Sequence, residues 1–184
     1  QRANELSKQI RQAIRRRAII FPSGIELLRG EIEDTNTPFL TAQLESVGMK
    51  VTKGEIIPDD FDSAVGIFLQ AVENGFGLAV STGGVGAEAK DVNVEAAKRV
   101  CDVFYAPEIL HFQKGTGRHA KGSVCIGVGI ADQCTIVNLP GPHAEVTAVA
   151  PILLQYCREE LSAKELAEEL AQCLRRRWSR HTHH

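Results

Sequence analysis

Long apolar runs, a basic excess and paired cysteines are all missing from this sequence, and each absence excludes a class of protein. No apolar segment reaches the roughly 20 residues that a membrane-spanning helix needs, and no signal-peptide pattern is present. The formal net charge of -2 lacks the basic excess of a dedicated nucleic-acid binder. We therefore expect neither a nucleic acid nor a membrane as partner.

The five cysteines are odd in number, and no two of them form a CxxC pair. Most lie in apolar segments, which is typical of small, reduced core residues rather than of disulfides or nucleophiles. This pattern favours the cytoplasm. The five are Cys101, Cys125, Cys134, Cys157 and Cys173.

The sequence does contain the composition of one globular domain, with 43% hydrophobic and 24% charged residues in a chain of 184. Residues 1–17 are expected to be an N-terminal helix, whose few apolar side chains form a narrow stripe. Residues 18–160 are expected to form an α/β domain. Residues 161–184 are expected to form a C-terminal helix and tail that pack on the same domain.

Short apolar segments alternate with helical ones from residue 18 onward. Strands separated by helices predict right-handed βαβ crossovers, and hence a three-layer α/β/α fold with a mainly parallel sheet. Pro151 should kink or break its helix. The expected strands are 18–21, 51–57, 78–81, 124–128 and 135–139. The expected helices run from 36 or 37 to 48, from a cap at Asp62, and over 92–104, 143–160 and 162–178.

Four loops follow the expected strands, and they carry most of the glycine, proline and carboxylate residues of interest. They are Ser23-Gly24, Pro58–Asp60, Thr82–Gly86 and Pro140–Pro142. In open α/β sheets, ligands bind beyond the carboxyl ends of the strands. We therefore expect these loops to converge on one rim that holds the ligand.

The loop Thr82–Gly86 is the most informative of the four, because it places Gly83, Gly84 and Gly86 between a buried strand and a helix. Glycine permits positive φ and close backbone approach, and a helix N-terminus attracts anions. The spacing matches neither the dinucleotide fingerprint nor the Walker A loop. Phosphate binding by main-chain N–H groups is the leading interpretation.

Asp59 and Asp91 lie in two neighbouring rim loops, and two carboxylates so placed could share one Mg²⁺ with a substrate phosphate. Each residue also has a simpler interpretation. Asp91 could cap the helix that follows it, and Asp59 could be a turn residue after proline.

Asp34 and Asn36 precede a helix, and capping accounts for only one of them, so contact with a polar ligand is plausible for the other. His119 and His143 have no partner at metal-ligand spacing and are expected to be ordinary surface residues. The basic segment 115–123 is either a loop over an anionic ligand or a solvated turn.

Four motifs in this order resemble the molybdopterin-binding domain superfamily over about residues 18–156, in particular its CinA-type (competence/damage-inducible) and adenylyltransferase members. The matching segments are Ser23-Gly24-x-Glu26-Leu27-Leu28-x-Gly30-x-Ile32-x-Asp34-Thr35-Asn36, Ile57-Pro58-Asp59, Thr82-Gly83-Gly84-x-Gly86 with Asp91, and Asn138-Leu139-Pro140-Gly141.

The resemblance implies a three-layer α/β fold and a pocket for a pterin that carries a phosphate, so that molybdopterin is the expected ligand. It implies that Asp59 and Asp91 support Mg²⁺-dependent transfer of AMP onto the pterin phosphate. The residues expected to bind the ligand are Ser23, Gly24, Asp34, Asn36, Thr82, Gly83, Gly84, Gly86, Pro140 and Gly141.

Two other functions remain open at this point. CinA-type domains resemble a pyrophosphatase that acts on ADP-ribose-like nucleotides, and the same rim could serve a non-enzymatic pterin- or nucleotide-binding module. Relatives are often trimers, which implies a homo-oligomer. Aromatic residues make up only 5% of the chain, so few side chains could stack on a pterin ring.

Overall fold

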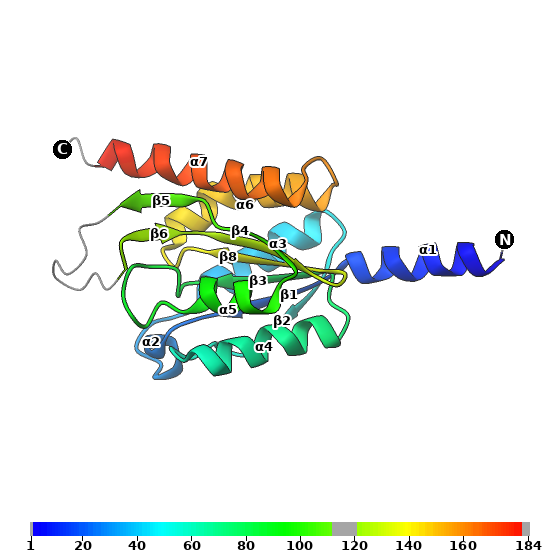
Figure 1. The fold of residues 1–184 in the computed structure, drawn as a ribbon, viewed down its shortest axis with the longest axis horizontal. Coiled ribbons are helices and arrows are strands. Elements are labelled where there is room, and N and C mark those ends of the chain that lie inside the picture. The colour runs from blue at the N-terminus through cyan, green and yellow to red at the C-terminus, as the bar shows by residue number, and fades with distance from the viewer. Residues whose placement is uncertain (1, 112–120, 182–184) are drawn as a thin grey trace.

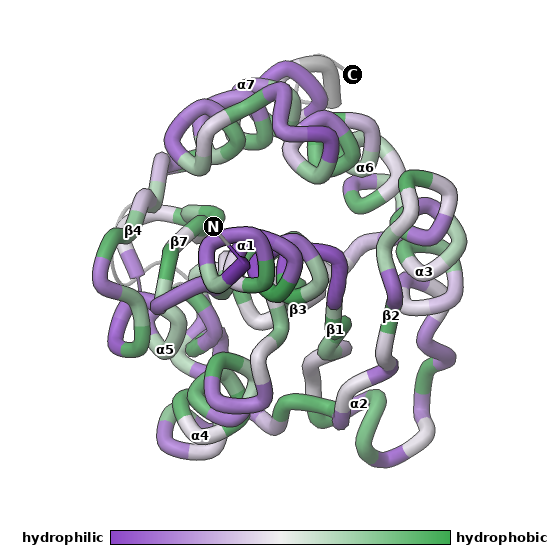
Figure 2. Tube along the Cα trace, turned by 90° about the vertical axis from the view of Figure 1, so that its right-hand side faces the viewer, coloured by the Kyte–Doolittle hydropathy of each residue, from purple (hydrophilic) through white to green (hydrophobic). Residues whose placement is uncertain are grey.

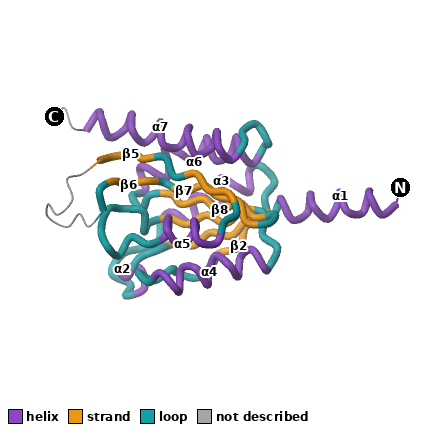
Figure 3. The backbone as a smooth tube through the Cα atoms, in the orientation of Figure 1, coloured by secondary structure: helices purple, strands orange, loops and turns teal. Residues whose placement is uncertain are grey.

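A six-stranded sheet in the order β2-β1-β3-β8-β7-β4 forms the centre of the fold (Figures 1 and 3). The computed structural model describes residues 2–111 and 121–181; His119 and most of the segment 115–123 lie outside these ranges. The helices are α1 (Arg2–Arg15), α2 (Ile25–Leu28), α3 (Asn36–Ser46), α4 (Phe61–Glu73), α5 (Asn93–Val100), α6 (His143–Cys157) and α7 (Ala163–His181). The strands are β1 (Arg17–Pro22), β2 (Lys50–Lys53), β3 (Leu78–Thr82), β4 (Val103–Tyr105), β5 (Glu108–His111), β6 (Ser123–Cys125), β7 (Gly127–Ala131) and β8 (Cys134–Leu139).

The sheet is parallel where the expected rim lies and antiparallel at one edge. Strands β2, β1, β3 and β8 run parallel, so their carboxyl ends share one side of the sheet. Strands β7 and β4 pair antiparallel beyond β8, and β5 with β6 forms a separate two-stranded sheet. The predicted three-layer α/β fold with a mainly parallel sheet is confirmed.

Each face of the sheet has its own hydrophobic core, because side chains alternate along each strand. Ile20 belongs to the core beneath α3, α6 and α7, whereas Ile19 and Phe21 belong to the core beneath α4 and α5. Figure 2 shows the strands between α6 and α7 on one side and α4 on the other.

The two terminal helices differ in how they are held. The apolar side of α7 is fully buried, with Leu166, Leu170 and Leu174 at 0% exposure. Helix α1 has no buried residue and projects beyond the sheet (Figure 1), with Leu6 59% exposed. No helix within the described ranges, α7 included, is both long and apolar enough to cross a membrane.

Two helix boundaries predicted from the sequence are wrong. Helix α4 is capped by Asp60, whose carboxylate accepts a hydrogen bond from the Ser63 N–H at 2.8 Å, and not by Asp62. Helix α5 ends at Val100 instead of Phe104, because Cys101 is extended and Val103–Tyr105 pairs with β7 as β4. Branched and aromatic residues favour this pleated position over a helical one.

Of the kink or break expected at Pro151, the break is wrong, because α6 runs unbroken through this residue. Pro151 and Thr147, four residues before it, are both exposed. The carbonyl of Thr147 that loses its helical N–H partner therefore faces water, which limits the cost of the proline.

Truncating a buried leucine of α7 should destabilise the whole domain. We expect Leu166→Ala to lower the free energy of unfolding by about 2–5 kcal/mol, since it removes a fully buried side chain and leaves a cavity. The matched variant Leu6→Ala, on the exposed face of α1, should change it by less than about 0.5 kcal/mol. Urea unfolding of both variants measures this; equal losses would show that α7 does not stabilise the core.

Candidate functional site

The loop after β1 lies directly beside the loop that carries Asp59. Ser23 forms a parallel bridge with Ile57, and the Gly24 N–H donates to the Ile57 carbonyl at 3.1 Å. Gly24 has φ of 129°, a conformation that favours glycine. The backbone pairing therefore extends the β1–β2 side of the sheet into the rim and fixes both loops there.

The glycine loop after β3 is bent into the left-handed region at two successive residues, since Gly83 and Gly84 have φ of 87° and 65°. The Gly83 N–H donates to the Leu139 carbonyl at 3.0 Å. The next three N–H groups, of Gly84, Val85 and Gly86, donate to no acceptor in the part of the chain that the structure describes. Those N–H groups are left for water or for a ligand.

Asn93, in the first turn of α5, ties the glycine loop to the β1 loop. Its side-chain amide donates to Ser23 Oγ and to the Gly83 carbonyl, each at 2.9 Å, and its own N–H donates to the Gly84 carbonyl at 3.1 Å. It is 1% exposed, and its Oδ1 has no partner among the described residues. A Cβ on Gly84 would lie 2.5 Å from Asn93 Nδ2, so the contact requires glycine there.

Asn93 is absent from the site residues predicted from the sequence. An asparagine at the start of a helix is normally interpreted as a cap, which hides any other role. Its position could have indicated the role. Asn93 lies two residues after Asp91, in the first turn of the helix that follows the glycine loop.

The loop after β8 is held by Asn36, at the start of α3. The Asn36 amide donates to the Gly141 carbonyl at 2.7 Å, and Asn36 Oδ1 lies 2.9 Å from His143 Nδ1. A Cβ on Gly141 would lie 3.5 Å from Gly83 Cα, so this loop also lies against the glycine loop. His143 is exposed, as expected of a surface residue, and its ring nitrogen also contacts the Asn36 side chain.

Asp34, and not Asn36 or Thr37, is the acceptor at the start of α3. Its Oδ1 accepts from the Thr37 N–H at 3.0 Å, whereas its Oδ2 is buried with no partner among the described residues. Thr82 and Pro140 are both buried where β3 and β8 end. The structure therefore brings the expected ligand-binding residues of all the rim loops together.

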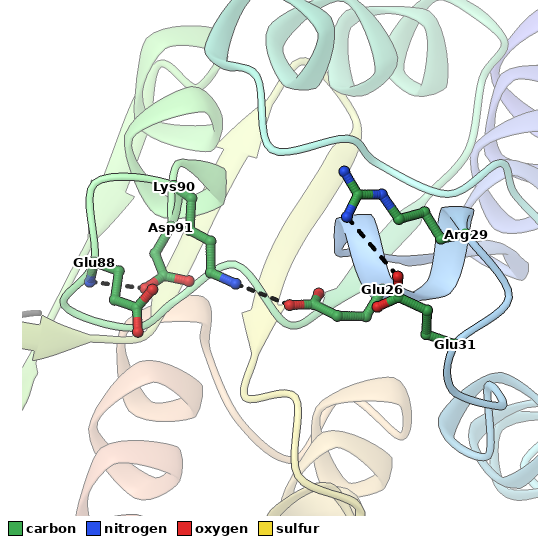
Figure 4. Close-up of polar contacts among 6 residues, drawn as sticks. All are labelled: Glu26, Arg29, Glu31, Glu88, Lys90 and Asp91. Atoms are coloured by element: carbon green, nitrogen blue, oxygen red, sulfur yellow. Dashed lines mark hydrogen bonds and ion pairs between the residues drawn. The ribbon is translucent and has the colours of Figure 1, made fainter.

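Asp91 does not cap α5, which begins at Asn93 and has no side-chain cap bond. Its Oδ2 instead accepts from the Glu88 N–H at 2.9 Å and closes the loop on itself (Figure 4). A Cβ on Gly86 would lie 2.4 Å from Asp91 Oδ2. A side chain at position 86 would therefore displace the Asp91 carboxylate from this position.

Asp59 lies near charged side chains of α2 and of the β3–α5 loop. Partial burial raises the pKa of its carboxyl group above the ordinary value, with Glu26 and Asp91 acting in the same direction and the Lys90 ammonium against it. Lys90 Nζ forms an ion pair with Glu26 Oε1 at 3.0 Å, which joins the β3–α5 loop to α2 (Figure 4).

The residues as arranged do not fit the Mg²⁺ expected at Asp59 and Asp91. The chain would offer the ion only these two carboxylates, because no group of three acidic, histidine or cysteine side chains within the described residues could hold a metal ion. One oxygen of Asp91 already accepts a main-chain hydrogen bond, and the Lys90 ammonium lies close enough to influence Asp59. A divalent ion prefers free carboxylate oxygens.

A cavity of about 710 Å³ lies at the amino ends of β3 and β8, at the end of the sheet opposite the rim. Its lining includes Arg11 and Arg15 of α1 and Leu78 at the start of β3. Tyr156, also in the lining, bonds to Thr135 at 2.7 Å. None of the expected site residues lines this cavity.

Removing the Asn93 amide should loosen the rim. We expect Asn93→Ala to lower the free energy of unfolding by about 1–3 kcal/mol, because it leaves a partly buried Gly83 carbonyl and the Ser23 hydroxyl without their donor. Asn74→Ala, at the exposed end of α4, is the control and should cost less than about 0.5 kcal/mol. If urea unfolding showed similar losses of unfolding free energy in the two variants, Asn93 would not hold the two loops together.

The raised pKa of Asp59 should appear in the pH dependence of stability. Because its folded-state pKa is above the ordinary value, ionisation costs stability as pH rises through that range. Asp59→Asn should therefore be more stable than the parent protein at neutral pH. The difference should vanish below the ordinary pKa of aspartate, where both side chains are neutral. Thermal unfolding across pH checks this; a less stable variant at neutral pH would contradict it.

Comparisons with known proteins agree with the geometry. The family model described as "Probable molybdopterin binding domain" matches residues 6–160. A CinA-like protein of Amoebophilus asiaticus is 30% identical over 86 residues, which cover 47% of this chain and 21% of that protein. A CinA-like protein of Kosmotoga olearia is 26% identical, with 76% of this chain and 41% of that protein covered, so the chain spans less than half the length of these curated relatives.

Solved structures show the same fold. The CinA protein of Thermoplasma acidophilum has a TM-score of 0.61 at 21% identity, covering 77% of this chain and 98% of that one. The molybdopterin biosynthesis enzyme MoaB of Thermus thermophilus has a TM-score of 0.60 at 23% identity, covering 80% and 96%. With the family match over most of its length, the chain belongs to the molybdopterin-binding domain family, and its relatives include CinA-like proteins.

Proposed function

We propose that the rim at the carboxyl ends of β1, β3 and β8 binds molybdopterin, in the biosynthesis or handling of the molybdenum cofactor. The observation that carries the proposal is the run of three N–H groups, of Gly84, Val85 and Gly86, that have no acceptor in the described parts of the chain. Main-chain donors of this kind, next to the N-terminus of α5, suit the phosphate of the ligand.

The surrounding contacts support the proposal because they hold these donors in place before a ligand arrives. Asn93 fixes the glycine loop against Ser23, and Asn36 fixes the Gly141 loop against α3. A loop ordered in advance loses less conformational freedom on binding. The bound phosphate would therefore be positioned by backbone geometry more than by a mobile side chain.

The pterin ring requires hydrogen-bond acceptors, and Asp34 supplies one at the same rim. Its buried Oδ2 has no partner within the described residues, although Oδ1 accepts from α3. A buried acceptor without a donor costs free energy unless a ligand donates to it. We assign Asp34 Oδ2 to a ring N–H group, which suits a site with few aromatic side chains for stacking.

Adenylyl transfer and hydrolysis of ADP-ribose-like nucleotides are the catalytic alternatives. Both would use a divalent ion at Asp59 and Asp91, where the donors do not fit one as arranged. The arrangement therefore supports ligand binding better than either reaction. A cytoplasmic location and a trimeric assembly remain predictions; the five free thiols are compatible with the first.

A methyl group on Gly84 should abolish tight binding. The Cβ of Gly84→Ala would lie 2.5 Å from Asn93 Nδ2 at a φ of 65°, so the loop must move. We expect the affinity for molybdopterin to fall at least tenfold, about 1.4 kcal/mol, by calorimetry under anaerobic conditions. Gly66→Ala, where a Cβ meets nothing within 4 Å, is the control. Unchanged affinity in a folded Gly84→Ala protein would rule out the glycine loop as the phosphate site.

A further inference from the structure

The rim carries an excess of negative charge that opposes an anionic ligand. Glu26 of α2, Asp59 after β2, and Glu88 and Asp91 after the glycine loop are all acidic, and Asp59 lies within electrostatic reach of both Glu26 and Asp91. Like charges at such distances repel, most strongly where water is partly excluded. A phosphate at the Gly84 and Gly86 N–H groups therefore needs a compensating cation nearby.

Lys90 is the cation placed to act there. Its ammonium forms the ion pair with Glu26 at 3.0 Å, and Glu26 is the main cause that raises its pKa, with Asp59 and Glu88 adding to it. Figure 4 shows the Lys90 side chain extending from the Asp91 loop toward α2. The charge therefore lies between α2 and the loop that carries the expected phosphate-binding N–H groups.

The ion pair is open enough for a ligand to replace one partner. The side chains of Lys90 and Glu26 are 43% and 40% exposed, and exposed ion pairs contribute little stability. A phosphate carries more charge and more acceptor oxygens than one carboxylate, so it competes well for an ammonium. Exchange of Glu26 for a phosphate would leave the ammonium charge-paired throughout.

Among the described residues, Lys121 is a second lysine that contacts this loop, but its ammonium is already paired within the protein. Its ammonium pairs with Glu95 Oε1 at 2.7 Å and also donates to the Asp91 carbonyl, and it is only 28% exposed. Its own N–H donates to the Ala87 carbonyl at 3.0 Å. Lys121 therefore braces the loop from behind and is not available to a ligand in the way that Lys90 is.

We propose that Lys90 supplies the positive charge at the phosphate end of the ligand site, so that this chain binds its ligand without a divalent ion, with Glu26 as the resting counter-ion of the ammonium. The proposal rests on the proposed function for the identity of the ligand. It accounts for the mismatch between Mg²⁺ and the donors around Asp59 and Asp91. It also assigns Lys90 a role that neither the family description nor the expected site residues include.

Three variants separate this role from a general effect of charge, with molybdopterin affinity measured in EDTA. Lys90→Gln should weaken binding roughly tenfold or more, as loss of a charge-assisted hydrogen bond does. Glu26→Gln should strengthen it roughly two- to fivefold, because the ammonium no longer has a competitor. Lys98→Gln removes the same charge from the far end of α5 and should change affinity less than about twofold, since bulk charges are screened. Unchanged affinity in Lys90→Gln, or equal losses in Lys90→Gln and Lys98→Gln, would overturn the proposal.

A second arm uses Mn²⁺ alone, followed by electron paramagnetic resonance, and does not depend on the pterin. Both the parent protein and Lys90→Gln should leave the Mn²⁺ signal free, because no three carboxylates within the described residues are grouped so as to hold a metal ion. Mn²⁺ bound to the parent protein and lost in Asp91→Asn would overturn the proposal. If the parent protein binds no molybdopterin, the proposed function fails, and the Mn²⁺ result then tests the absence of a divalent ion on its own.

Discussion

The side-chain amide of Asn93 holds together the two loops from which the candidate site is made. It donates both to Ser23 after β1 and to the Gly83 carbonyl after β3, while the Asn93 N–H closes on Gly84. Because the amide is buried, these bonds are little weakened by water. The left-handed bend at Gly84 follows from this tie, and the N–H groups of Val85 and Gly86, which have no acceptor among the described residues, come directly after it. Without it, the donors would not share a fixed direction.

The charges at the rim follow from the same backbone. Since Asp91 accepts from the Glu88 N–H, the segment between them turns back on itself, and Lys90 extends from that turn toward Glu26. The loop that offers main-chain donors thus also carries the accessible ammonium. Geometry and charge at the rim are two results of one loop conformation, so a change in either alters both.

Much of the fold could be predicted from the sequence, because strand and helix patterns depend on local periodicity. The short apolar runs at 18–21 and 78–81 predict β1 and β3, and the pleat of β1 then places Ile19 and Ile20 in opposite cores. What could not be predicted depends on contacts between distant residues. The strand at Val103–Tyr105 forms because β7 offers an edge, and α6 tolerates Pro151 because that side of the helix faces water.

The candidate site shows the same division. The glycines and the loops that carry them could be identified from residue type and spacing. Asn93 and His143 could not, because each acts through a partner 70 or more residues away, Ser23 and Asn36 respectively. Asp91 was identified for its carboxylate, yet a contact three residues away occupies one of its oxygens. Side-chain role therefore depends on tertiary contacts that residue type alone does not reveal.

The central claim is that main-chain N–H groups after β3 receive the phosphate of the ligand. It is tested most directly by following the amide resonances of a ¹⁵N-labelled protein during titration with molybdopterin. The account predicts that the largest shifts fall on Gly84, Val85 and Gly86. The claim would be contradicted if the glycine-loop resonances stayed unchanged and the shifts fell only on residues that line the cavity at the opposite end of the sheet, such as Arg15 and Leu78.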